Sequence, residues 1–228
     1  MTAFPAVCAF APDVSKLQPV KPSSKIKNIV FDVGQVLFAY NPELVIDRLI
    51  PESLHKAYYL EHLFLSPMWH QMDRGDVSHE QAKHRLFGND PVKRLELDRL
   101  LDNFALHLDV IEGTRDLFLQ LGKRFPLYLL SNFQAEAFDV LLQANPFLNQ
   151  ATGMVVSGQI NMMKPEPEIY DYLLSTHNLN PSETVFIDDL AENIAAARVA
   201  GMHGIVFESP AQLKSALLPF TEIWEDIK

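Results

Sequence analysis

The sequence predicts an α/β fold: a doubly wound parallel sheet that carries an inserted helical segment. Three observations support this fold class. Short apolar runs rich in β-branched residues recur along the chain, helical periods separate the later runs, and residues 33–125 separate the first run from the second. A chain of 228 residues that is 48% hydrophobic can bury one core, with or without a smaller inserted domain.

Five apolar runs are the predicted strands: residues 28–32, 126–131, 154–157, 184–188 and 204–207. The interior of each run is apolar, which is typical of a strand buried on both faces of a sheet. Helical periods lie between the later strands, at residues 137–142, 169–176 and 192–200, and Gly201 ends the last of them. The predicted buried face of the middle helix is Ile169, Tyr172, Leu173 and Thr176. Such alternation predicts parallel strands joined by right-handed crossovers.

The segment between the first two strands is too long for one crossover helix, so we expect a helical insertion. Asn41-Pro42 starts a helix with Val45 and Leu49 on one face, and Ser78 with Gln81 forms a predicted capping box. Asp90-Pro91 starts another helix. Its apolar residues keep helical spacing as far as residue 108: Leu97, Leu100, Leu101, Phe104 and Leu108.

These patterns divide the chain into three parts. Residues 1–25 hold several prolines and no regular pattern, which predicts a flexible tail rather than a signal peptide. Residues 26–41 and 109–228 form the predicted core domain, and residues 42–108 form the predicted helical cap domain.

Charge and composition favour a small-molecule partner. The net charge of −10 arises from 29 acidic and 19 basic residues without a basic block, which argues against nucleic acid and against an anionic membrane surface. No segment reaches the roughly 18 continuous apolar residues of a membrane span. The single cysteine, Cys8, cannot form an internal disulfide, which predicts a cytoplasmic protein. The sequence carries no signal of oligomeric state.

Polar residues with chemical potential stand at the ends of three predicted strands and before one helix: Asp32, Ser131, Asn132, Asp188, Asp189 and Lys164. Taken singly, each has a structural explanation as a turn former, a local hydrogen-bond partner or a surface charge. The carboxyl ends of parallel strands form a common ligand crevice, however, so these residues should converge. Together they offer a carboxylate nucleophile, carboxylates for a hard cation, and a hydroxyl and an ammonium for an anion, as phosphoryl transfer requires.

Each predicted role has a chemical reason. A carboxylate such as Asp32 attacks phosphorus only if repulsion from the phosphate oxygens is reduced, and Mg²⁺ held by oxygen ligands reduces it. Asp32 and Asp189 can hold that ion. Lys164 and Ser131 would then stabilise the charge on the equatorial phosphate oxygens. We therefore expect Mg²⁺ as cofactor and a small phosphorylated substrate.

The order of these residues resembles a known family. Asp32 in "FDVGQVL", Ser131 in "LLSN", Lys164 in "MKP" and the acidic pair in "FIDDLAENI" resemble the four motifs of the haloacid dehalogenase-like (HAD) hydrolases. The resemblance extends from residue 26 to about residue 208, and the insertion lies where that family has its type-1 cap. It implies a HAD-like Rossmannoid core.

The resemblance also implies a role for each matched residue. Asp32 would be the nucleophile, and Ser131, Asn132 and Lys164 would bind phosphate. Asp189 would bind Mg²⁺ directly, together with Asp32 and the main-chain carbonyl of Gly34. Asp188 and Asn193 would support the metal or its waters.

Gly34 departs from the pattern of most phosphatases in this family, which have an aspartate there as general acid and base. General acid-base help is typically worth about 10²–10⁴-fold, so its loss should slow the reaction without abolishing it if another donor substitutes. A rate that does not depend on the leaving group would point to another proton donor, for example from the cap. Trp69 and Arg74 of the cap are candidates for substrate contact.

Three interpretations remain open from the sequence. The favoured one is a Mg²⁺-dependent phosphatase that forms an aspartyl phosphate, because the D-x-G-x-V motif resembles a branch that includes sugar-1-phosphate phosphatases. The second is a 2-haloacid dehalogenase, which needs no proton for halide but lacks the metal-binding acidic pair. The third is a non-catalytic binding or regulatory protein on a HAD scaffold, against which the intact Asp32, Lys164 and Asp189 argue.

Overall fold

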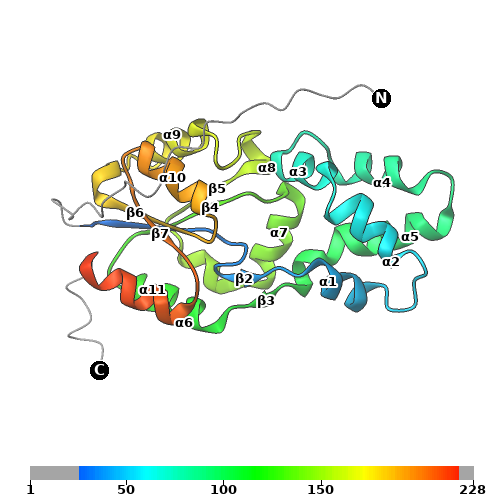
Figure 1. The fold of residues 1–228 in the computed structure, drawn as a ribbon, viewed down its shortest axis with the longest axis horizontal. Coiled ribbons are helices and arrows are strands. Elements are labelled where there is room, and N and C mark those ends of the chain that lie inside the picture. The colour runs from blue at the N-terminus through cyan, green and yellow to red at the C-terminus, as the bar shows by residue number, and fades with distance from the viewer. Residues whose placement is uncertain (1–25, 221–228) are drawn as a thin grey trace, which may run out of the picture.

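The computed structural model describes residues 26–220, so the predicted tail at residues 1–25 and the last eight residues, 221–228, lie outside the described part of the chain. Its centre is a five-stranded parallel sheet in the order β5-β4-β1-β6-β7 (Figure 1). The strands are β1 (Asn28–Phe31), β4 (Leu127–Ser131), β5 (Gly153–Val156), β6 (Thr184–Asp188) and β7 (His203–Val206). The predicted doubly wound sheet is confirmed.

Helices cover both faces of this sheet because successive strand residues point to opposite sides. One face packs against α6 (Glu112–Leu121), α7 (Ala135–Ala144) and α11 (Pro210–Leu217). The other packs against α9 (Pro167–Thr176) and α10 (Ala191–Val199). In β1, Phe31 belongs to the first apolar cluster and Val30 to the second. Burial on both faces explains why the strands read as unbroken apolar runs.

Between the first two strands of the large sheet the chain is mainly helical, and these helices lie at one end of the molecule (Figure 1). They are α1 (Pro42–Leu49), α2 (Lys56–Tyr59), a π-helical turn (Leu60–Phe64), α3 (Pro67–Arg74), α4 (His79–Phe87), α5 (Pro91–Asn103) and a 3-10 turn (Phe104–His107). Asn41 caps α1 by accepting a hydrogen bond from the Leu44 N–H, and the predicted capping box at the start of α4 is present. We call residues 42–108 the helical insertion.

Local details differ from the sequence expectation. The helix predicted to run as far as Leu108 ends at Asn103, and Leu108 is extended. Two short strands, β2 (Phe38–Ala39) and β3 (Asp109–Val110), pair antiparallel where the chain enters and leaves the insertion, and they are too short to show a pattern. The predicted strand residue Ser157 begins the short helix α8 (Ser157–Ile160).

The buried face of α9 also differs from the prediction. Tyr172 is 37% exposed, whereas Tyr170 is fully buried. The Tyr170 ring packs against Phe186 of β6, with ring centroids 6.0 Å apart, and its hydroxyl donates to the Asn193 carbonyl. Tyr170 and Tyr172, on either side of Asp171, fit the helical spacing almost equally well, and tertiary contacts decide between them.

Among residues 26–220, the helices are too short or too polar for a membrane crossing.

Candidate active site

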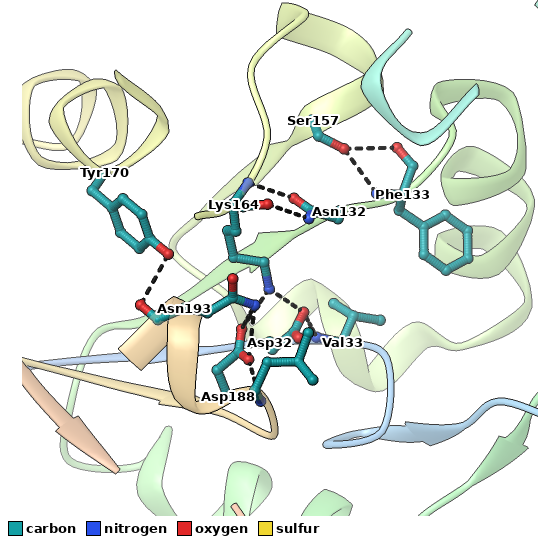
Figure 2. Close-up of polar contacts among 10 residues, drawn as sticks. Asp32, Val33, Asn132, Phe133, Ser157, Lys164, Tyr170, Asp188 and Asn193 are labelled. Atoms are coloured by element: carbon teal, nitrogen blue, oxygen red, sulfur yellow. Dashed lines mark hydrogen bonds and ion pairs between the residues drawn. The ribbon is translucent and has the colours of Figure 1, made fainter. Parts of the chain in front are cut away.

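Three neighbouring strands deliver polar residues to one edge of the sheet (Figure 2). Asp32 follows β1, Ser131 ends β4, and Asp188 ends β6. Because β1 lies between β4 and β6, these three positions are adjacent in space although they are far apart in sequence. The structure thus brings together the residues that the sequence singled out.

Lys164 links two of the carboxylates. Its Nζ lies 2.8 Å from Asp32 Oδ1 and 2.7 Å from Asp188 Oδ2, and all three side chains are buried (Figure 2). Burial alone would lower the pKa of Lys164, but the two carboxylates outweigh it and hold this pKa above its usual value. Lys164 is therefore a buried ammonium aimed at the predicted nucleophile, not the solvated surface charge that its sequence context also allowed.

Asn132 fixes the main chain of Lys164. Its Nδ2 donates to the Lys164 carbonyl at 2.9 Å, and its Oδ1 accepts from the Lys164 N–H at 2.8 Å. Asn132 also lines the cavity described below. Its amide is mainly engaged with Lys164, so the structure shows a positioning contact at the residue predicted to bind phosphate.

Asp188 is surrounded by hydrogen-bond donors. Besides Lys164, it accepts from the Leu190 N–H at 2.8 Å and from Asn193 Nδ2 at 3.0 Å on both oxygens. A completely buried carboxylate with this many donors is held rigidly. Asp188 thus orients Lys164. The support of the metal or its waters that the resemblance implies for Asp188 stays a prediction.

The next residue, Asp189, is half-buried and faces the cavity. One carboxylate oxygen from each member of the acidic cluster (Asp32, Asp188 and Asp189) lies within 4.8 Å of the others. Burial raises the pKa of Asp32 and of Asp189, and Asp188 adds to both rises. The cluster holds three carboxylates, and the single ammonium of Lys164 does not balance their negative charge. Carboxylate oxygens are hard ligands that suit a divalent cation, so the cluster can hold one.

Like the acidic cluster, Ser131 has the features of a group that contacts a bound ligand. Its hydroxyl is buried at the end of β4 and has no hydrogen-bond partner among the described residues. A buried hydroxyl normally has a partner, so this one is available to an oxygen of a bound anion. Ser131 is not among the residues that line the cavity, in contrast to its neighbour Asn132.

A cavity of about 330 Å³ opens above the acidic cluster. Asp32, Lys164 and Asp189 line one side of it, and Gly34 lies beside them. The other side is an aromatic wall formed by Tyr40, between β2 and α1, by residues of the insertion and by one residue of the core. Its members are Tyr40, Phe64, Trp69, Phe104 and Phe133. Adjacent rings of this wall are in contact, with centroid separations from 4.6 Å for Phe64–Trp69 to 5.9 Å for Tyr40–Trp69.

This geometry can be compared with known proteins. Residues 26–201 match the family model described as haloacid dehalogenase-like hydrolase. The chain belongs to this family. The resemblance seen in the four motifs is thereby confirmed, and the protein is a HAD-like hydrolase.

Two curated relatives of this HAD-like hydrolase are phosphatases by name. It is 28% identical over 180 residues to the sesquiterpene phosphatase astK of Aspergillus oryzae, covering 78% of this chain and 88% of that protein. It is 25% identical over 200 residues to the D-ribitol-5-phosphate phosphatase of Bacteroides thetaiotaomicron, covering 84% and 97%. A HAD family enzyme of the same bacterium, solved with magnesium and inorganic phosphate, has a TM-score of 0.68 at 24% identity, covering 81% of this chain and 95% of that one. This likeness shows the shared fold.

The helical insertion contributes residues to the cavity of this HAD-like hydrolase. Some of them differ from those that the sequence predicted. Trp69 of α3 lies in the aromatic wall, as the sequence suggested for a substrate contact. Arg74 does not line the cavity, because its guanidinium pairs with Glu166 of the core. Asp73, which the sequence did not single out, does line it. Its place four residues after Trp69 on one helix was the available signal, since residues with this spacing share a face.

Proposed function

We propose that this chain is a Mg²⁺-dependent phosphatase that hydrolyses a small phosphomonoester through an aspartyl phosphate on Asp32. One observation carries the proposal: Asp32 faces a cavity with the buried Lys164 ammonium 2.8 Å away and two further carboxylates beside it. Phosphoryl transfer relies mainly on positioning and charge stabilisation, and this arrangement supplies both.

The chain's own residues account for the two steps. In the first, an Asp32 oxygen forms a bond to phosphorus while the bond from phosphorus to the alcohol oxygen breaks, and the alcohol leaves with a proton. In the second, water attacks phosphorus, inorganic phosphate leaves, and the Asp32 carboxylate is restored. Lys164 and the Ser131 hydroxyl would stabilise the phosphate oxygens. Mg²⁺, held by Asp32, Asp189 and the Gly34 carbonyl with Asp188 in support, would supply charge neutralisation.

The lining of the cavity favours an alcohol with an apolar body. The Gln35 amide of the lining is not free for a polyol, because it is already paired with the Tyr40 main chain through two hydrogen bonds of 3.2 Å. The aromatic wall offers apolar contact instead. The names of the two relatives represent these two chemistries, a sesquiterpene and a sugar alcohol. We infer that the substrate belongs to the apolar class, with sugar phosphates as the alternative.

The acidic cluster also separates this proposal from its competitors. A dehalogenase has no use for two carboxylates next to the nucleophile, and a non-catalytic scaffold has no use for a buried Lys164 aimed at Asp32.

The expectations of a cytoplasmic location and of no nucleic-acid or membrane partner belong to the same proposal. They rest on the single cysteine and on the net charge of −10.

Replacement of the nucleophile tests the proposal. Asp32→Asn keeps the size of the side chain but removes its nucleophilic charge, so we expect loss of nearly all phosphate release from a panel of apolar and sugar phosphates with Mg²⁺. Acid quenching of the wild type with labelled substrate should place the phosphoryl group on Asp32. A folded Asp32→Asn protein with most of its activity would refute the assignment. A higher kcat/KM for ribitol 5-phosphate than for a sesquiterpene alcohol phosphate would refute the apolar substrate class.

A further inference from the structure

The leaving alcohol needs a proton, and position 34 has no side chain to donate it. In the described part of the chain, three carboxyl groups line the cavity: Asp32, Asp73 and Asp189. Asp32 and Asp189 belong to the acidic cluster beside Lys164. Asp73 comes from the insertion, so it alone of the three approaches the cavity from the side of the aromatic wall.

The position of Asp73 is fixed by contacts with the core. Its main-chain carbonyl accepts a hydrogen bond from the Ser157 hydroxyl at the start of α8, and Ser157 Oγ also accepts from the Phe133 N–H at 2.9 Å. Next to it, the Arg74 carbonyl accepts from Asn161 at 3.4 Å. These contacts hold the end of α3 against the core. Asp73 and Trp69 are one helical turn apart, so both face the cavity.

Asp73 has no cationic partner among the described residues. Its neighbour Arg74 is committed to Glu166 and lies 3.6 Å from Asp76. Burial raises the pKa of Asp73 to about 8, and the nearby Gln134 amide offsets only part of this rise. Asp32 has the Lys164 ammonium 2.8 Å away to hold its charge, whereas Asp73 has no such cation and favours its acid form. The acid form is the state that a general acid requires.

Two other titratable groups near Asp73 line the same cavity: Tyr40, which lies between β2 and α1, and His70 of α3. The neighbouring Arg74 of α3 and His79 of α4 contact Glu166 and Gln134 instead. Burial raises the pKa of Tyr40, and Asp73 adds to that rise, so the phenol stays neutral when Asp73 ionises. The His79 ring is held 2.7 Å from Gln134 Oε1, which places it behind the amide rather than against the carboxyl.

We propose that Asp73 is the general acid and base for this reaction, in place of the carboxyl group missing at position 34. The proposal rests on the proposed phosphatase function. As the bond between phosphorus and the alcohol oxygen breaks, the Asp73 carboxyl gives its proton to that oxygen. The resulting carboxylate then accepts a proton from the water that attacks the aspartyl phosphate, which restores the acid form.

The test compares two phosphomonoesters with similar aromatic bodies but different leaving groups. Nitrophenol leaves without a proton, whereas benzyl alcohol needs one. Asp73→Asn should lower kcat/KM for benzyl phosphate, which reports the step that expels the leaving group, by about 10²–10⁴-fold. The loss in kcat/KM for p-nitrophenyl phosphate should be smaller by a factor of at least about ten. The matched control is Asp76→Asn, which removes an exposed carboxylate just beyond α3 that does not line the cavity. It should keep both wild-type rates.

The pH profile gives a second test that does not depend on the variant folding. Because the acid form of Asp73 is active in the step that expels the alcohol, wild-type kcat/KM for benzyl phosphate should fall as pH rises through about 8, and kcat/KM for p-nitrophenyl phosphate should not. Equal losses on both substrates in Asp73→Asn, or pH profiles that coincide in the wild type, would overturn the proposal. Activity retained by Asp32→Asn would overturn the phosphatase function itself, so the two failures are distinguishable.

Discussion

Replacing Gly34 with aspartate tests which side of the cavity protonates the leaving group. Gly34 is outside the left-handed region of backbone conformations, and a Cβ built on it meets no heavy atom within 4 Å. An aspartate therefore fits without strain. A side chain at such a site restricts the unfolded chain and raises the free energy of unfolding by about 0.4–1 kcal/mol. A fourth carboxylate near the acidic cluster opposes this gain, so Tm should shift by less than about 4 °C.

The expected effect on rate depends on Asp73. In the Asp73→Asn background the proton donor is missing, so Gly34→Asp should recover most of the loss of about 10²–10⁴-fold in kcat/KM for benzyl phosphate. In the wild-type background a donor is already present, and the same substitution should change kcat/KM far less. The two substitutions should therefore be strongly non-additive, as expected for residues that perform one task.

The assay is the kcat/KM for benzyl phosphate of four proteins: the wild type, each single variant and the double variant, all at saturating Mg²⁺. Gly34→Asn is the matched control, because it adds a similar side chain that cannot donate an acidic proton. Equal gains from Gly34→Asp in both backgrounds would show that Asp73 does not fill the role of the missing carboxyl. A rescue by Gly34→Asn as large as that by Gly34→Asp would show that space filling, and not acidity, restores the rate.

Two further predictions concern the metal and the substrate. Asp189→Asn should shift the Mg²⁺ dependence of activity to at least about tenfold higher concentration, because it removes a charged oxygen ligand from the acidic cluster; an unchanged Mg²⁺ titration would exclude direct binding. Trp69→Leu should raise KM for an apolar phosphate such as benzyl phosphate more than for glycerol phosphate, because it shortens the aromatic wall; equal changes in KM would argue that Trp69 serves the packing of the insertion and not substrate binding.

The sheet was predictable because each strand is buried on both faces. Unbroken apolar runs such as the one ending at Asp32 are rare outside parallel strands, and the helices between them leave few possible connections. Helix starts were equally clear, because Asn41-Pro42 and the capping box at Ser78 act through local hydrogen bonds. Local chemistry decides such features, and the sequence displays it directly.

Features that depend on distant contacts were not predictable. The pairing of β2 with β3 needs two segments about seventy residues apart, and neither is long enough to show a period. The choice between Tyr170 and Tyr172 on α9 depends on Phe186 of another element. At the site, the order of the motifs identified Asp32, Lys164 and Asp189. It did not reveal that Asn132 holds the Lys164 main chain, or that Arg74 pairs with Glu166 away from the cavity.

The proposed proton donor, Asp73, could not be found from the sequence motifs alone. A donor at position 34 lies two residues from the nucleophile, so it is seen in the sequence, whereas Asp73 reaches the cavity only through the packing of α3 on the core. Placing the proton donor on α3 instead of at position 34 has a chemical consequence. Trp69, which contacts the alcohol in the proposed complex, and Asp73, which would protonate its oxygen, share one face of one helix. An alcohol that does not fit the aromatic wall and displaces α3 would therefore also displace Asp73. Poor binding of the alcohol and slow protonation of its oxygen should then occur together.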